Sequence, residues 1–447
     1  MIGGNKMNSF MEKLENGLNK YLMPLADKIN RNKVMTAIKE GMMSSLPVTL
    51  IASVALILSN FPFLSDFAPS VDAILKKIFS PISPITLGLL AIYVIIGTAR
   101  SYSKQKNIDP LYGIMCALAS FLLVTPFTAV TDVIVNGETI KGALVNGLIP
   151  TNVLGASGVF PALLITFISI SVLAYLHHKD FTIKMPDSVP ENVAKPFLSI
   201  IPFGGAILVV LAIRLIFEVT PFGTLQNCVD TIITKPFLSF GNNIWVFLFI
   251  LIVAQVLWFF GIHGTNLVLN TVWQPIAMVA MAANLEAFNA GEPLPYVLTA
   301  AFTCFTGQAK LSEIVALCVV GKSKQSKAIG KLSLVPALFN IHEPFVFGLP
   351  VIMNTTLMLP WIFVEALQAG LAYLLVILTG AIPIFQAPWT CPPIIQQLIA
   401  TNFNPWSVVI TIATFVLGFV IWVPFMKLLD KQYLAAEKEQ EASGDSV

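Results

Sequence analysis

Ten apolar stretches long enough to cross a membrane constrain this chain more than any other feature of its sequence. A helix needs about 20 mainly apolar residues to span a hydrocarbon core of about 30 Å. The stretches cover residues 42–60, 82–99, 110–130, 155–176, 197–217, 243–261, 266–284, 296–320, 348–379 and 405–426. Because a spanning segment must satisfy its backbone hydrogen bonds internally, the sequence predicts an all-α membrane protein with about ten transmembrane helices.

The composition excludes several other classes of protein. Only 11% of the 447 residues are charged, whereas soluble domains contain about 25%. The net charge of +2 is too small to indicate a nucleic-acid partner. The five cysteines are scattered without a Cys-x-x-Cys pair, so we expect no disulfide framework, no metal site and no cofactor.

Three apolar pieces are too short, or too often interrupted by proline and polar residues, to be simple spans. They cover residues 225–241, 332–347 and 382–400. Irregular backbone at membrane depth is tolerated only where protein or a cavity shelters it. We therefore expect re-entrant or interfacial segments there, mostly in the second half of the chain.

The distribution of lysine and arginine predicts the orientation of the chain. Connections rich in these residues alternate with poor ones, and the segment before the first span is the richest. The positive-inside rule then places both termini in the cytoplasm. We divide the chain into a cytoplasmic amphipathic segment (1–41), a regular scaffold half (42–242), an irregular half that carries the site (243–430) and a polar cytoplasmic tail (431–447).

Charged residues at membrane depth are functional candidates because burying them is costly. Arg214 and Glu218 lie four residues apart, and Lys310 and Glu313 lie three apart, so each pair shares a helix face. We interpret both as structural ion pairs. The role of Glu365 stays open.

The first candidate site is the run from Trp258 to Asn266, Trp-Phe-Phe-Gly-Ile-His-Gly-Thr-Asn, between two apolar spans. Glycines on both sides of His263 allow the backbone to unwind and to approach a ligand closely. This pattern indicates a broken helix, although a histidine that only caps a helix would fit it equally well.

The second candidate site is Asn-Ile-His-Glu-Pro, residues 340–344. Pro344 disfavours helical geometry at Glu343, so backbone groups freed there need partners. Asn340, His342 and Glu343 concentrate hydrogen-bonding capacity at this break, and a ligand rich in hydroxyls would satisfy it. Trp258, Trp361 and Trp389 could stack on the apolar face of a sugar ring, although each would also fit the aromatic belt of a membrane protein.

Two sequence runs carry a resemblance to a known family. They are GIHGTN at 261–266 and SKAIGKLSLVPALFNIHEPFVFGLPVIMN at 326–354. The chain resembles enzyme IIC, the membrane subunit of the bacterial phosphoenolpyruvate-dependent sugar phosphotransferase system, in its lactose, cellobiose and diacetylchitobiose family. The start of the chain, through Lys39-Glu40-Gly41 to Pro47, is also similar to the family.

The resemblance implies a homodimer in the bacterial inner membrane, with ten spans, two re-entrant hairpins and amphipathic helices. The first half would form the dimer interface and the second would bind a disaccharide. The sugar would leave as a 6-phosphate, with the phosphoryl group coming through enzyme I, HPr and IIA to a cysteine of IIB. We expect IIB to be a separate protein, because only about twenty residues follow the last predicted span.

The resemblance also implies the site residues. His263 and Glu343 would lie near the sugar 6-hydroxyl and take the catalytic roles. The other predicted substrate-binding residues are Arg100, Gly155, Ser157, Trp258, Asn340, His342 and Trp389.

The sequence departs from the family pattern at two places. Many relatives have asparagine at the position of His342, and a stretch rich in glycine and serine where this chain has residues 306–313, which include Lys310 and Glu313. Both departures bear on which sugar is bound. The main alternative is an ion-coupled secondary sugar transporter, with Glu343 or Glu365 as its ion site.

Overall fold

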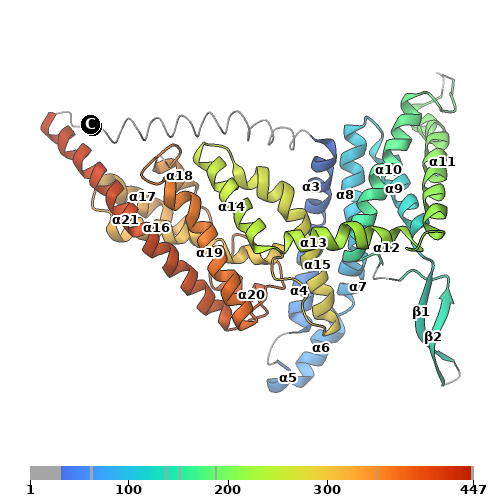
Figure 1. Ribbon diagram of the computed structural model, residues 1–447, viewed down its shortest axis with the longest axis horizontal. Helices are drawn as coiled ribbons and strands as arrows, with labels where there is room; N and C mark the ends of the chain where they lie inside the picture. The colour runs from blue at the N-terminus through green and yellow to red at the C-terminus, as the bar shows by residue number, and fades with distance from the viewer. Residues whose placement is uncertain are drawn as a thin grey trace.

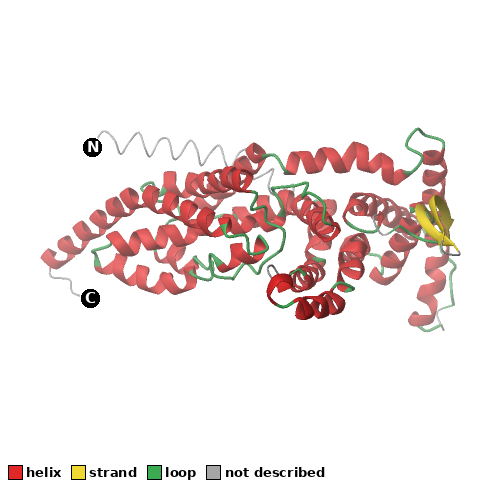
Figure 2. Ribbon diagram, turned by 90° about the horizontal axis from the view of Figure 1, so that it is seen from below, coloured by secondary structure: helices red, strands yellow, loops and turns green. Residues whose placement is uncertain are grey.

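The computed structural model describes residues 32–60, 64–135, 138–150, 153–186, 189–349 and 351–443. Most of the predicted N-terminal amphipathic segment, residues 1–31, lies outside this part of the chain. Helices make up nearly all of the fold, and they form two groups along an elongated molecule (Figures 1 and 2).

The first group contains the helices of the N-terminal half, on the right in Figure 1. Its long helices are α3 (Lys33–Ser44), α4 (Leu46–Ser59), α8 (Leu90–Gln105), α9 (Pro110–Val124), α10 (Val159–His178) and α11 (Glu191–Glu218). Short helices connect them: α5 (Leu64–Phe67), α6 (Pro69–Phe79), α7 (Ile82–Thr86), η2 (Leu87–Leu89) and η4 (Ala156–Gly158). The predicted ion pair is confirmed here, with Arg214 Nε 2.8 Å from Glu218 Oε1.

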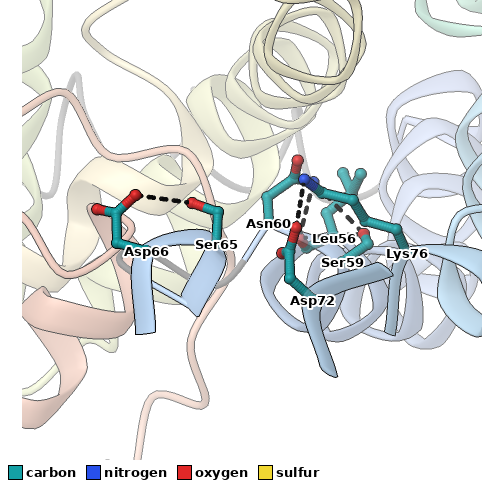
Figure 3. A network of polar contacts seen from close by, with 7 residues as sticks. All are labelled: Leu56, Ser59, Asn60, Ser65, Asp66, Asp72 and Lys76. Atoms are coloured by element: carbon teal, nitrogen blue, oxygen red, sulfur yellow. Dashed lines mark hydrogen bonds and ion pairs between the residues drawn. The ribbon is translucent and has the colours of Figure 1, made fainter. Parts of the chain in front are cut away.

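A polar network lies at the C-terminal end of α4 (Figure 3). The Ser59 hydroxyl donates to the Ala55 carbonyl at 2.7 Å, and the Asn60 amide donates to the Leu56 carbonyl at 3.0 Å. Nearby, Lys76 pairs with Asp72 at 2.8 Å on α6. The two side-chain bonds add to the backbone bonds of the last turn of α4, where the Asn60 backbone amide also donates to the Leu56 carbonyl at 2.9 Å.

The antiparallel hairpin of β1 (Thr128–Val135) and β2 (Glu138–Asn146) was not expected from the sequence. It projects at one end of the molecule in Figure 1. The predicted span 110–130 is therefore wrong at its end, because α9 stops at Val124. Thr125-Pro126 interrupts the helix, and the following segment is rich in threonine and valine, which favour strands.

A bent segment joins the two groups. It contains α12 (Leu225–Val229), the π-helix η5 (Asp230–Thr234) and α13 (Lys235–Gly241). This segment lies across the molecule in Figure 1 and meets α14 (Ile244–Phe259) at a bend of 65°. It occupies the irregular piece predicted at 225–241.

The second group contains the rest of the chain. It consists of α14, the π-helix η6 (Thr265–Trp273), α15 (Gln274–Ala290), η7 (Ala300–Phe305), α16 (Gln308–Val320), α17 (Lys324–Ala337), α18 (Glu343–Gly348), α19 (Met358–Thr379), α20 (Ile395–Ala400) and α21 (Trp406–Ser443). One of them, α15, packs against α3 and α4 of the first group. The predicted span 348–379 is shorter than expected, because α19 begins only at Met358.

The helices agree with a multi-pass membrane protein. Within the described residues, eight helices are long and apolar enough to cross a membrane, or nine if the segment Leu225–Gly241 and α14 are counted together as one bent span. The shorter apolar helix α9 is a further candidate. This count is roughly consistent with the ten spans expected from the sequence.

Two large apolar clusters hold the fold together. One extends through the first group, α14 and α15. The other lies among α16, α17, α18, α19 and α21, and contains the fully buried Phe345 and the nearly buried Trp361 and Trp422. The second cluster surrounds the segments in which the sequence predicts a binding site.

Candidate functional site

The first helix break follows α14, as the sequence predicts. Gly261 has φ = +81°, a left-handed conformation that favours glycine. A Cβ on Gly264 would lie 2.0 Å from the Ala254 carbonyl oxygen, so the chain crosses its own helix in backbone contact there. His263 Nδ1 accepts a hydrogen bond from the Asn266 amide at 3.3 Å. This turn exposes the His263 ring instead of continuing the helix.

The second break separates α17 from α18. Asn340 has φ = +60°, which asparagine tolerates better than most residues. Its side-chain amide donates to the Trp389 carbonyl at 2.7 Å and to the Cys391 carbonyl at 3.2 Å. Asn340 therefore fastens the break to the loop before α20.

Glu343 begins α18, and Pro344 occupies the first turn of this helix, where proline is favoured. The side chain of Glu343 lies outside the part of the chain that the structure describes. The predicted proximity of its carboxylate to His263 stays a prediction.

Four rings connect the two breaks, and we call them the aromatic row: His263, Trp258, His342 and Trp361. The Trp258 ring centroid lies 4.3 Å from that of His263 and 6.2 Å from that of His342. The His342 ring in turn stacks on Trp361 with centroids 6.2 Å apart and planes at 26°. Residues about eighty positions apart in sequence thus form one continuous surface.

Two hydrogen bonds hold this arrangement in place. The Met353 amide donates to the Phe259 carbonyl at 3.0 Å, which joins the end of α14 to the segment before α19. The Trp258 indole donates to the Thr265 hydroxyl at 3.2 Å, across the first break. The ring of Trp258 is therefore held at both ends of the turn that carries His263.

Several predicted site residues lie apart from the aromatic row. Arg100 is exposed on α8, where it borders a hollow together with Glu40 and Ser44. Trp389 contributes its backbone carbonyl to Asn340, but its indole is 64% exposed. Within the described residues, no ring contact joins that indole to the aromatic row.

Gly155 and Ser157 lie at the start of α10, against the second group. The Ala156 amide donates to Glu286 Oε1 at 2.9 Å, and a Cβ on Gly155 would lie 2.2 Å from the same oxygen. The Ser157 side chain is exposed. Glu286, on α15, was not predicted as a site residue, because its sequence neighbourhood resembles that of any apolar helix.

A cluster of charged residues next to the aromatic row was predicted only in part. Lys310, Glu313, Glu365 and His342 line one cavity together with residues of α14, α19 and α21. The predicted ion pair is not formed, because no salt bridge within 4 Å joins Lys310 to Glu313 in the described residues. Both side chains turn toward the cavity instead, where other helices bring further polar groups.

Comparison with known proteins decides the family. The profile described as "Phosphotransferase system, EIIC" matches residues 39–364. The chain belongs to this EIIC family. The EIIC chain is therefore the membrane subunit of a phosphoenolpyruvate-dependent sugar phosphotransferase system, and the relatives provide no support for the ion-coupled alternative.

Individual relatives cover the EIIC chain almost completely. The PTS system oligo-beta-mannoside-specific EIIC component of Bacillus subtilis (strain 168) is 32% identical over 434 residues, 95% of this chain and 96% of that one. The crystal structure of the transporter ChbC, the IIC component from the N,N'-diacetylchitobiose-specific phosphotransferase system, matches with a TM-score of 0.84 and 33% identity. That match covers 94% of this chain and 99% of ChbC.

A third relative differs in length. The PTS system lactose-specific EIICB component of Staphylococcus aureus (strain COL) is 27% identical over 444 residues, which cover 95% of the EIIC chain but only 74% of the relative. Its printed name joins the C and B components in one protein, which supports an association between EIIC and IIB.

Asn340 provides a first test of the second break. Asn340→Gly is expected to destabilise the protein by about 1–3 kcal/mol, because two carbonyls lose their donor. Asn340→Ala should cost about 1 kcal/mol more, because alanine is strained at positive φ. Thermal denaturation of the purified protein in detergent measures both changes. Equal stability of the two variants would contradict the backbone argument.

Proposed function

We propose that the EIIC chain binds a β-linked disaccharide along the aromatic row and presents its 6-hydroxyl for phosphorylation. The observation that carries this proposal is the contact between the two helix breaks, with Trp258 between His263 and His342. Aromatic faces accept the apolar side of a sugar ring, and polar groups at helix breaks bind hydroxyls.

The sugar class rests on the relatives. Their printed names refer to oligo-beta-mannosides, N,N'-diacetylchitobiose and lactose. The shared chemistry is a short β-linked saccharide. We extend that class to this chain, with cellobiose, lactose and diacetylchitobiose as the first candidates.

The proposed site uses residues with distinct roles. Trp258 supplies a ring surface, while Asn340 fastens the break and His342 forms its wall. We assign His263 and Glu343 to the 6-hydroxyl. Further contacts, from Arg100, Gly155, Ser157 and Trp389, would require these residues to approach the row when the sugar is bound.

The chemistry is a phosphoryl transfer. The 6-hydroxyl oxygen forms a bond to phosphorus while the bond from phosphorus to the IIB cysteine sulfur breaks. The hydroxyl proton passes to Glu343 or His263 as general base. The product carries additional negative charge, which an apolar pocket binds poorly, so phosphorylation favours release into the cytoplasm.

The same proposal includes the organisation of the protein. We infer a homodimer formed through the scaffold half (42–242), with the sugar bound in the half 243–430 and both termini in the cytoplasm of a bacterial cell. IIB, which receives its phosphoryl group from enzyme I through HPr and IIA, would approach from that side. The exposed lysines of α17, Lys327 and Lys331, are compatible with an anionic partner there.

A reconstituted system tests the proposal. In vesicles that contain the EIIC chain, labelled cellobiose should accumulate as its 6-phosphate when IIB, IIA, HPr, enzyme I and phosphoenolpyruvate are supplied. Omission of IIB should abolish accumulation, and ionophores should not change it. Accumulation of unmodified sugar driven by an ion gradient would contradict the proposal. Parallel assays with lactose and diacetylchitobiose identify the preferred sugar.

A further inference from the structure

A small cavity lies against His342, and Trp258 is not part of its lining. Its volume is about 30 Å³, and its lining includes Lys310, Glu313, Glu365, Trp361 and Trp422. A cavity needs about 10–15 Å³ to hold one water molecule, so this cavity has room for one or two water molecules. His342 and Trp361 belong both to this lining and to the aromatic row.

Three buried polar atoms of the cavity lining have no hydrogen-bond partner in the described part of the chain: Glu313 Oε1, Trp361 Nε1 and Trp422 Nε1. These residues are only 4%, 7% and 2% exposed. Buried polar atoms are nearly always paired, with protein or with ordered water. One acceptor and two donors around a space of this size match the bonding pattern of bound water.

The cavity also brings charged groups together: one lysine faces two carboxyl groups across it. Lys310 is the cation in the lining, and it shares the cavity with Glu313, Glu365 and His342. Gln255 of α14 donates a hydrogen bond to Glu365 Oε2. The charged groups come from α16 and α19, so their interactions also join these helices to the second break.

We propose that Lys310, Glu313 and Glu365, together with cavity water, form a network of one ammonium and two carboxyl groups that positions His342 against Trp258 and Trp361. The network then holds His342 in position and does not itself bind the sugar. Lys310 acts as a positioning residue, because removing its charge leaves the two carboxylates uncompensated and drives water or side chains to rearrange behind His342. This inference rests on the proposed sugar site.

Charge-restoring variants test the network. Lys310→Met should weaken cellobiose binding by about tenfold or more, since two buried carboxyl groups lose the cation that shares their cavity. Lys310→Met combined with Glu313→Gln should return to within about threefold of the wild type, and so should Lys310→Arg. Lys438→Met, which replaces an exposed lysine of α21, is the matched control and should bind normally.

Two readouts separate positioning from general damage. Cellobiose affinity is measured on purified dodecyl-maltoside-solubilised protein. The tryptophan emission of the sugar-free protein is compared between variants, since two of its seven tryptophans, Trp361 and Trp422, line the cavity. Lys310→Met should shift that emission and the charge-restored double variant should reverse the shift. Failure of the wild type to bind any of the three candidate disaccharides would refute the proposed function, whereas the emission changes address the network alone.

Three experimental results would overturn the proposal. Wild-type affinity in Lys310→Met overturns it, as does a folded double variant as weak as the single one. If Lys310→Met does not fold, the double variant and Lys310→Arg decide. Since both preserve the net charge of the cluster, the failure of both to fold or to bind also overturns the proposal.

Discussion

Replacement of Glu343 by glutamine is expected to reduce phosphorylation-coupled sugar uptake by about a hundredfold or more, the usual contribution of a general acid or base. The substitution preserves size but removes the charge that would bind the 6-hydroxyl and accept its proton. The backbone supports this role, because Glu343 begins α18 directly after His342, whose ring lies in the aromatic row.

The Glu343→Gln experiment compares uptake in the reconstituted vesicles with protein stability in detergent. Glu218→Gln is a suitable control, since Glu218 is exposed and pairs with Arg214 far from the second break. It should retain uptake, because exposed ion pairs contribute at most about 1 kcal/mol. Uptake near the wild-type rate in Glu343→Gln would remove this residue from the site.

Gly264→Ala is expected to have the largest effect on the structure of the first break. The added Cβ would lie 2.0 Å from the Ala254 carbonyl oxygen and 2.8 Å from its Cα, and backbone atoms cannot move aside as a flexible side chain can. The cost should be at least about 3 kcal/mol, the upper end of ordinary overpacking. Both thermal stability and sugar binding should fall, because His263 and Trp258 flank this crossing.

Gly204→Ala provides the matched control for that variant. Gly204 lies within α11, and its added Cβ would meet no atom within 4 Å. Alanine is favoured over glycine in a helix by about 0.5–1 kcal/mol, so this variant should be as stable as the wild type or more stable. If both variants melted alike, the close crossing at Gly264 would not matter to the fold.

The two departures from the family pattern that the sequence predicted lie in one place. The side chains of Lys310, Glu313 and His342 all line the same cavity. A change of sugar preference would therefore be expected from substituting them together and not singly. The sequence marked each departure, but only the fold shows that they are neighbours.

Long apolar runs and the alternation of lysine-rich connections determine, from the sequence alone, that this chain crosses a membrane many times. The bilayer leaves few other ways to satisfy the backbone. The sequence also predicted both helix breaks, because the glycines around His263 and the proline after Glu343 act locally on backbone geometry. The β1–β2 hairpin was not predicted, because its first strand begins at Thr128, inside the apolar run that was assigned to the span 110–130.

Tertiary structure alone decided which polar residues face one another. Lys310 and Glu313 share a helix face, and the sequence therefore predicted a pair; the side chains of α14, α19 and α21 turned that face into one wall of a cavity. The aromatic row likewise joins α14 to segments about eighty and a hundred residues later. Local sequence dictates where a helix ends, whereas the packing of distant helices dictates what the freed groups meet, and no local pattern encodes that packing.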